Sequence, residues 1–335
     1  MATRVAINGF GRIGRQSFRH LMNADDLELV AINDVGDPEN LAYLMRHDSA
    51  YPAPTVEVRA AEGKFHWGER AFPFLNVHSP AELPWSDMGV ELVLEASGVF
   101  TDADDASKHL DAGAERVIVS APSKGADVTI CLGCNEDTFD PDEHTVVSNA
   151  SCTTNALAPV AKVLDDQFGI ATGYLTTVHA ATSSQKIVDL PHKKWRRGRS
   201  VMSNIVPTTT GAAKATTKVL PQLEGKMDGM AIRVPVLVGS VIDFVVRTES
   251  PASVEAINNA FREAAGSERM RGILDITDEE LVSSDIVGTE FSAIIDAPST
   301  GVLGDDTVKV LAWYDNEWAY SKRCIDLLGY IARQG

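Results

Sequence analysis

Apolar runs and stretches with helical periodicity alternate along the first 150 residues. Such alternation is typical of an α/β unit, in which a mostly parallel sheet carries helices on its faces. Ligands of such sheets bind at the carboxyl ends of the strands. We predict strands at residues 3–8, 27–32, 91–95 and 116–120, and helices at 15–22 and 104–112.

The pattern changes after residue 150. Strand-like runs become longer and are interrupted by fewer helices, which indicates an α+β unit with a mixed or antiparallel sheet. A chain of 335 residues exceeds the usual size of one hydrophobic core, so we predict two domains. Residues 1–150 form the first, completed by an amphipathic helix at 316–335, and residues 151–315 form the second. In the second we predict strands at 171–180, 227–234 and 240–248 and a long loop at 182–210.

A glycine-rich turn joins the first predicted strand to the first helix. Gly9 permits the tight turn, Gly11 lets the backbone approach a pyrophosphate, and Gly14 lets the helix pack closely on the strand. Asp34 follows the second strand, where a carboxylate can accept hydrogen bonds from ribose hydroxyls. The order strand, glycines, helix, strand and Asp predicts a Rossmann-type NAD site. The alternative is a glycine-rich turn that binds no ligand.

Cys152 lies among small polar residues just before a stretch with helical spacing. The start of a helix offers unpaired backbone N–H groups and the positive end of the helix dipole, and both favour a thiolate. We therefore expect a lowered thiol pKa and a nucleophile. The alternative is a small buried apolar residue. Cys131 and Cys134 form a C-x-x-C without a second pair nearby, so we expect a structural role for them and no metal site.

Two further features accompany this cysteine. His179 ends an apolar strand and precedes small residues, which makes it the best general base among eight histidines. A structural core histidine is the alternative. The densest basic cluster, residues 193–199, lies inside the long loop. On its own it fits an anion site, a nucleic-acid patch or a subunit interface equally well.

These segments together resemble the phosphorylating glyceraldehyde-3-phosphate dehydrogenases over the whole chain. The segment around Cys152 is close to diagnostic of that family. The matching segments are residues 8–15, 96–101, 120–123, 148–159, 176–180, 208–214, 233–235 and 313–317.

The resemblance implies a reversible, NAD-dependent oxidation of D-glyceraldehyde 3-phosphate to 1,3-bisphosphoglycerate. Cys152 would form a thiohemiacetal and then a thioester, His179 would be the base, and inorganic phosphate would release the acyl group. The cofactor set is Gly9, Gly11, Arg12, Ile13, Gly14, Asp34, Ser97, Ser120 and Asn316. Inorganic phosphate is assigned to Ser151, Thr153, Arg197, Thr210 and Gly211, and the substrate phosphate to Thr182 and Arg233.

The resemblance also implies a homotetramer, with Arg196 and Arg199 at subunit contacts. Leu190 and Pro191 resemble the NAD-preferring members. His78 stands where many relatives carry an arginine near the adenine pocket, so adenine contacts there stay open. Two alternatives remain: a sister enzyme that oxidises erythrose 4-phosphate and releases the acid with water, and a dinucleotide-binding protein without catalysis.

Composition adds one unusual property, a formal net charge of −17 from 47 acidic and 30 basic residues. Repulsion on this scale is screened at high salt, so we expect adaptation to a salt-rich cytoplasm in a halophilic organism. Nucleic acid and anionic membranes are poor partners for such a surface. Four cysteines, no signal-peptide pattern and no long apolar run predict a cytoplasmic protein.

Overall fold

The computed structural model describes residues 2–335 and divides them into two compact units. The first unit holds the residues up to 130, residues 136–150 and residues 321–335, and the second holds residues 131–135 and 151–320. Both units are α/β in composition, and the fold predicted from the sequence is confirmed. Within residues 2–335, no helix is both long and apolar enough to cross a bilayer.

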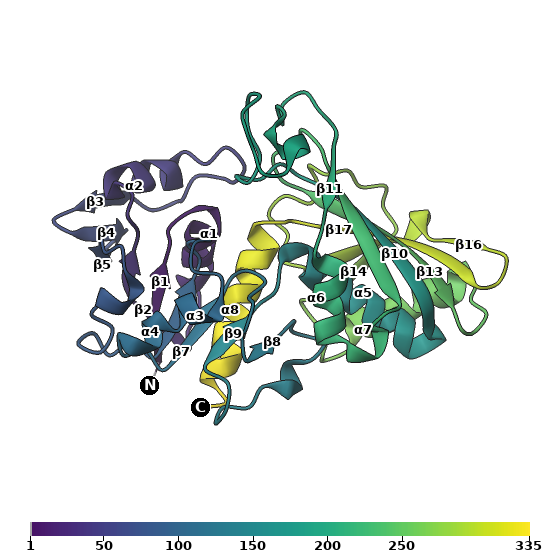
Figure 1. Ribbon diagram of the computed structural model, residues 1–335, viewed down its shortest axis with the longest axis horizontal. Coiled ribbons are helices and arrows are strands. Elements are labelled where there is room, and N and C mark those ends of the chain that lie inside the picture. The colour runs from purple at the N-terminus through teal and green to yellow at the C-terminus, as the bar shows by residue number, and fades with distance from the viewer. Residues whose placement is uncertain (1) are drawn as a thin grey trace. The chain divides into compact units, whose positions relative to one another are not determined.

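The first unit is built on a nine-stranded sheet in the order β3-β4-β5-β2-β1-β6-β7-β9-β8. Neighbouring strands from β5 to β8 pair in parallel, whereas β3, β4 and β5 form an antiparallel meander at one end (Figure 1). The chain starts at the centre of the sheet and winds out to both sides, as in doubly wound nucleotide-binding sheets. The strands are β1 (Thr3–Asn8), β2 (Leu27–Asn33), β3 (Val58–Ala61), β4 (Lys64–Trp67), β5 (Arg70–Leu75), β6 (Leu92–Glu95), β7 (Arg116–Val119), β8 (Val128–Thr129) and β9 (Val146–Ser148).

The helices of this unit fix its strands through an apolar core in which Trp85, Val93 and Val117 are almost fully buried. They are α1 (Arg12–Leu21), α2 (Pro38–Arg46), α3 (Ala103–Ala106), α4 (Lys108–Asp111) and most of α8 (Trp318–Ala332), with single 3-10 turns η1 (Pro80–Glu82) and η2 (Glu136–Thr138). The prediction of one helix at 104–112 is wrong. The Ser107 hydroxyl donates to the Asp104 carbonyl, which competes with the helical hydrogen bonds, and the helix breaks into α3 and α4.

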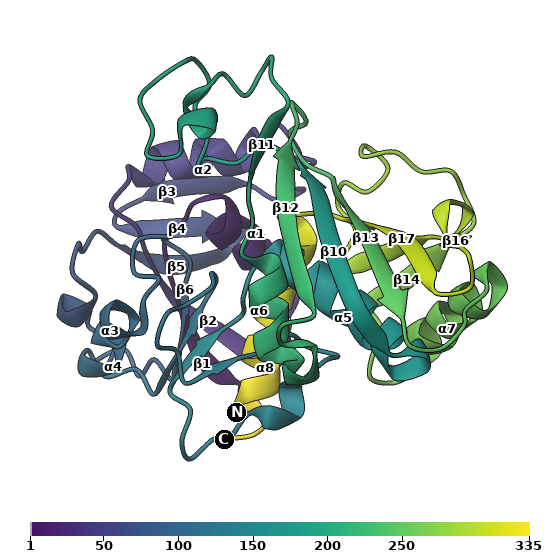
Figure 2. The ribbon, with the colours of Figure 1, turned by 45° about the vertical axis from the view of Figure 1, so that its right-hand side comes forward.

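The second unit carries a mixed sheet in the order β11-β12-β10-β13-β17-β15-β14, with β16 paired to β17. β10 pairs with β12 in parallel and with β13 in the antiparallel sense. Figure 2 shows β12, β10 and β13 side by side. The elements are α5 (Cys152–Phe168), β10 (Ile170–His179), η3 (Trp195–Gly198), β11 (Val206–Thr209), α6 (Ala212–Val219), η4 (Pro221–Leu223), β12 (Met227–Arg233), β13 (Ser240–Thr248), α7 (Val254–Gly266), β14 (Leu274–Thr277), β15 (Ala293–Asp296), η5 (Ala297–Ser299), β16 (Gly301–Leu303) and β17 (Thr307–Tyr314).

Two predicted boundaries are corrected by the structure. The stretch 182–210 is not entirely loop, because it contains η3 and the edge strand β11. The last helix begins at Trp318 rather than at residue 316, because the Asp315 carboxylate accepts the N–H groups of Glu317 and Trp318 and so satisfies the first turn.

Close backbone contact at the glycine-rich turn gives a stability prediction. A Cβ added at Gly14 would lie 1.9 Å from the Gly9 carbonyl oxygen, whereas one added at Gly11 would meet nothing within 4 Å. Gly14→Ala should therefore destabilise the protein by about 3 kcal/mol, and Gly11→Ala by less than about 1 kcal/mol. Denaturant unfolding of both variants measures the difference, and equal losses would contradict this account of the turn.

Candidate active site

The nucleophile candidate sits at the start of a long helix. Cys152 is the first residue of α5, and Ser151 caps that helix by accepting the Thr154 N–H at 3.1 Å. The chain enters the cap through Ala150, whose φ of 53° is uncommon for a residue other than glycine. The helix start predicted around this cysteine is confirmed.

His179 faces this thiol from the end of β10. Its Nε2 lies 3.5 Å from the Cys152 Sγ. Its Nδ1 lies 2.8 Å from the Ala180 carbonyl oxygen and 2.8 Å from Arg233 Nη1, and Arg233 Nη1 donates to the same carbonyl at 3.0 Å. Action as a base toward Cys152 requires the tautomer with its proton on Nδ1, which donates to Ala180 and leaves the lone pair on Nε2, toward sulfur. The pair has the geometry of a nucleophile and its base.

The electrostatics of this pair are set by burial and by one arginine. Burial and, next in size, the Arg233 guanidinium 2.8 Å from Nδ1 together lower the pKa of His179 to about 3. Burial also raises the pKa of the Cys152 thiol, although Arg233 and Thr153 lower it. The predicted fall in this thiol's pKa is therefore wrong, because desolvation outweighs the helix terminus. His179 is neutral near pH 7 and available to take the thiol proton.

Arg233 is built to receive an anion. The parallel register of β10 and β12 sets it opposite His179, and its Nη1 donates to the Thr182 hydroxyl at 3.4 Å. Its Nε is buried and has no hydrogen-bond partner among residues 2–335. Among residues 2–335 it forms no ion pair with a carboxylate, and burial lowers the pKa of its guanidinium. A desolvated cation with an unused donor favours a bound anion.

A second arginine is held next to the start of a short helix. Arg197 donates from Nε to the Thr208 hydroxyl at 3.0 Å and from Nη2 to the Thr209 carbonyl at 3.3 Å. Thr210 and Gly211 follow directly, and Gly211 precedes the first turn of α6. The structure thus brings three of the five residues predicted for inorganic phosphate into one neighbourhood. The other two, Ser151 and Thr153, belong to the start of α5.

Two residues that the sequence did not single out complete this environment. The Tyr314 hydroxyl lies 3.0 Å from the Thr153 hydroxyl and 2.8 Å from the Thr177 hydroxyl, and its ring meets that of His179 edge to face. Burial raises the pKa of this tyrosine. Ser184 lies 2.9 Å from the Thr182 hydroxyl and accepts from Arg197 Nη1 at 3.5 Å, so it links the two arginine neighbourhoods. No spacing rule marks either residue.

The first unit offers a separate cavity of about 310 Å³ at the carboxyl ends of its strands. Of the predicted cofactor residues, Gly9, Gly11, Asp34 and Ser97 line it, as does His78. Arg12, Ile13, Gly14 and Ser120 are not part of this lining; Arg12 instead forms an ion pair with Asp48. Asn316 belongs to the second unit, where its Oδ1 accepts from Gly239 N–H and the Ser240 hydroxyl.

This cavity fits a dinucleotide. The Asp34 carboxylate accepts one backbone N–H on each oxygen, from Phe10 and Gly36, which orients it and leaves lone pairs for ribose hydroxyls. The open space over Gly11 and the start of α1 leave room for a pyrophosphate. Within residues 2–335, no group of three or more His, Cys, Asp or Glu side chains could hold a metal ion.

Comparisons with known proteins agree along the whole chain. Residues 3–103 match the family model described as glyceraldehyde 3-phosphate dehydrogenase, NAD binding domain, and residues 151–316 match the C-terminal domain of the same family. The chain is 48% identical to the glyceraldehyde-3-phosphate dehydrogenase of Streptomyces coelicolor and 49% identical to that of Geobacillus stearothermophilus, with all of each chain covered. Identity to glyceraldehyde-3-phosphate dehydrogenase 2 of Bacillus subtilis is 49%, covering 99% of this chain and 97% of the relative.

The position of Arg233 gives a prediction for pH dependence. Its guanidinium lowers the pKa of both His179 and Cys152, so Arg233→Met should raise both. Less thiolate then exists at neutral pH, and alkylation of Cys152 by iodoacetamide should slow about tenfold, with its midpoint moved up by about one pH unit. Arg262→Met, which removes an exposed ion pair with Asp278, is the control. An unchanged midpoint in Arg233→Met would rule out this electrostatic role.

Proposed function

This chain belongs to the glyceraldehyde 3-phosphate dehydrogenase family, and we propose that it catalyses the reversible, NAD-dependent oxidative phosphorylation of D-glyceraldehyde 3-phosphate to 1,3-bisphosphoglycerate. The observation that carries the proposal is the 3.5 Å contact between the Cys152 thiol and Nε2 of His179, beside a cation that no carboxylate of residues 2–335 pairs with.

The chemistry of the pair follows from its protonation states. Neutral His179 removes the thiol proton as sulfur adds to the aldehyde carbon and returns that proton to the resulting alkoxide, which gives a thiohemiacetal and leaves the ring neutral again. The same ring then takes the hydroxyl proton while the C–H bond breaks and the thioester forms. Bound NAD supplies the hydride acceptor for that step. The Cys152 N–H at the start of α5 stabilises the oxyanion that develops.

The two arginines bind different anions of the reaction. Arg233 with Thr182 holds the substrate phosphate and so positions the aldehyde for attack. Arg197, Thr210 and Gly211, with Ser151 and Thr153, hold inorganic phosphate, which attacks the thioester and leaves as the acyl phosphate. The Thr153 hydroxyl also forms a hydrogen bond with the Tyr314 hydroxyl.

Pre-steady-state formation of NADH at varied phosphate tests this division. Cys152→Ser should abolish the burst, and His179→Asn should slow it about 10²–10⁴-fold. Arg233→Ala should eliminate the burst at ordinary substrate concentrations, whereas Arg197→Ala should keep it and raise the KM for phosphate. Arg262→Ala, which removes an exposed ion pair with Asp278, serves as the control, with no change expected.

Three outcomes would count against the proposal. If Arg197→Ala removes the burst as fully as Arg233→Ala, the division between two anion sites is wrong. If wild-type turnover does not depend on phosphate, the chemistry is that of the erythrose-4-phosphate enzymes. If no substrate aldehyde produces a burst, the chain binds dinucleotide without catalysis.

We propose NAD rather than NADP as the cofactor. Asp34 lines the cavity with both carboxylate oxygens fixed, and a ribose 2′-phosphate would meet this charge directly. Wild-type kcat/KM should favour NAD by at least about tenfold, and Asp34→Ala should narrow the ratio. Equal or better use of NADP by the wild type would refute this role of Asp34.

We further propose that the chain works as a homotetramer in a salt-rich cytoplasm. The loop around η3 exposes large apolar side chains suited to an interface: Ile187, Val188, Leu190, Trp195, Met202 and Ile205. The reaction needs a reduced Cys152, which cytosolic redox conditions maintain. Assembly multiplies the charge of −17 per chain, and at ~1 M salt the Debye length of about 3 Å screens it.

This proposal predicts that the fraction of chains assembled into tetramers and the melting temperature both increase from ~0.1 to ~2 M KCl. Sedimentation equilibrium and thermal melting measure them. A monomer at every salt concentration would contradict the assembly, and a melting temperature that is flat or falling would contradict the adaptation to salt.

A further inference from the structure

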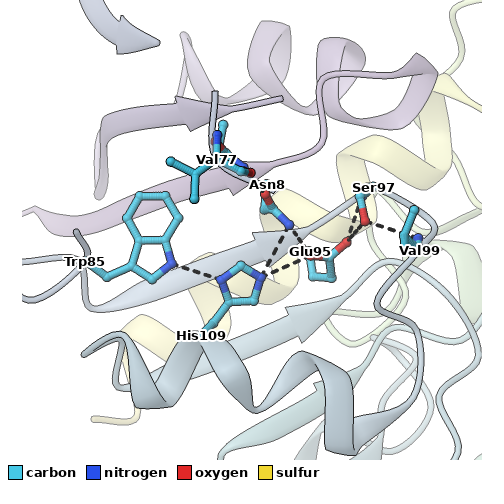
Figure 3. Close-up of polar contacts among 8 residues, drawn as sticks. Asn8, Val77, Trp85, Glu95, Ser97, Val99 and His109 are labelled. Atoms are coloured by element: carbon cyan, nitrogen blue, oxygen red, sulfur yellow. Dashed lines mark hydrogen bonds and ion pairs between the residues drawn. The ribbon is translucent and has the colours of Figure 1, made fainter. Parts of the chain in front are cut away.

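A buried carboxylate ends strand β6 beneath the dinucleotide cavity. Glu95 is only 2% exposed, and no Lys or Arg among residues 2–335 pairs with it. Four donors reach it instead (Figure 3). Its Oε1 accepts from the Ser97 N–H at 2.8 Å and the Ser97 hydroxyl at 2.5 Å, and its Oε2 accepts from Asn8 Nδ2 at 2.5 Å and His109 Nε2 at 3.1 Å. Only an ionised carboxylate can accept four hydrogen bonds with two oxygens.

Trp85 fixes the protonation of the histidine. An indole N–H can only donate, and Trp85 Nε1 lies 2.9 Å from His109 Nδ1, so Nδ1 carries no proton. The proton of the neutral ring is therefore on Nε2, directed at Glu95 (Figure 3). Glu95 and His109 form a charged acceptor and a neutral donor, not an ion pair. Both are fully enclosed, so water cannot replace either partner.

The first oxygen of Glu95 holds one wall of the cavity. Val99 N–H donates to the Ser97 hydroxyl oxygen at 3.1 Å, so that hydroxyl must give its own proton to Glu95. Both Ser97 and Val99 line the cavity. A Cβ added at Gly9 would lie 2.3 Å from the Ser97 nitrogen, so the Ser97 turn touches the glycine-rich turn directly. Anchoring Ser97 therefore also limits where the backbone at Gly9 can lie.

The second oxygen holds the facing wall. Because Asn8 gives its amide N–H to Glu95, its Oδ1 is left to accept from Asn33 Nδ2 at 2.7 Å. Asn33 in turn accepts the Val77 N–H at 2.9 Å. Asn8, Asn33 and Val77 all line the cavity. One carboxylate thus sets the hydrogen-bond direction along a chain of side chains from β6 through β1 and β2.

We propose that Glu95 is a positioning residue for the dinucleotide, and that His109, locked by Trp85, is its neutral donor. Ionised Glu95 orders the Ser97–Val99 turn and the Asn8–Asn33 wall before the cofactor arrives, so binding does not have to order them. A carboxamide could not replace it, because its NH₂ group would face donors. The inference rests on the proposed function only through cofactor binding.

Calorimetry with ADP-ribose, the part of NAD without nicotinamide, tests this role apart from activity. Glu95→Gln should lower the affinity for ADP-ribose and for NAD by about tenfold to a hundredfold. It should raise the KM for NAD while kcat at saturating NAD stays within about twofold. A merely structural residue would lower the melting temperature without this KM-against-kcat split.

Two matched variants separate positioning from stability. Glu91→Gln alters a carboxylate just before the same strand, where its Oε1 accepts the Arg4 N–H far from the cavity. Val117→Ala removes buried volume from the same core but alters none of the four donors to Glu95. Both should bind ADP-ribose within about twofold of wild type, Val117→Ala with a lower melting temperature. If Val117→Ala weakens ADP-ribose binding as much as Glu95→Gln does, the effect is one of lost stability and the inference is overturned.

A measurement on the wild type decides the case if Glu95→Gln does not fold. The Ser97 and Val99 amides should exchange slowly with deuterium in the protein without NAD, because their acceptors are already in place. Fast exchange that stops only on adding NAD would overturn the inference. Equal ADP-ribose affinity in the wild type and in folded Glu95→Gln would also overturn the inference, but it would not contradict the proposed function. A wild type that binds no NAD would overturn both.

Discussion

The parallel pairing of β10 with β12 is the constraint on which the candidate active site depends. It sets His179 opposite Arg233 at the ends of two neighbouring strands, so a cation lies 2.8 Å from an imidazole nitrogen. A charged ring beside this cation is unfavourable, and burial adds to the cost. The histidine is therefore neutral, and in the tautomer with its proton on Nδ1 its lone pair faces Cys152. Strand pairing thus favours the neutral form of the proposed base.

The same arrangement leaves Arg233 incompletely satisfied. Within the described part of the chain its Nε has no hydrogen-bond partner, and the nearby acceptors are a carbonyl and a hydroxyl rather than a carboxylate. Glu95 presents the opposite case, since four donors surround it. A buried charge whose partners are complete rigidifies its surroundings, whereas one with a missing partner favours a ligand of opposite sign. The two residues illustrate how burial can serve either positioning or binding.

Much of the fold and part of the site follow from local sequence. The strand at Thr3–Asn8, the glycine-rich turn and the helix start at Cys152 depend on neighbours within a few residues, where apolar periodicity, glycine and capping residues act. The two-part α/β architecture also follows, because the spacing of apolar runs differs on either side of residue 150. The prediction from apolar periodicity was wrong at Ser107, where a hydroxyl interrupts a helix that periodicity predicts to be continuous.

Tertiary structure decided the properties that depend on distant neighbours and on exclusion of water. The thiol pKa of Cys152 is one, since burial, which no spacing rule measures, outweighs the helix terminus. The placement of Tyr314 and Ser184 beside the predicted residues is another, because both contacts join segments far apart in sequence or within an irregular loop. The role of Glu95 is a third: its donors come from β1, α4 and the turn after β6, and only folding brings them to one carboxylate. The sequence determined which chemical groups the chain possesses, and the folded structure determined their protonation and their partners, because both depend on local dielectric and geometry.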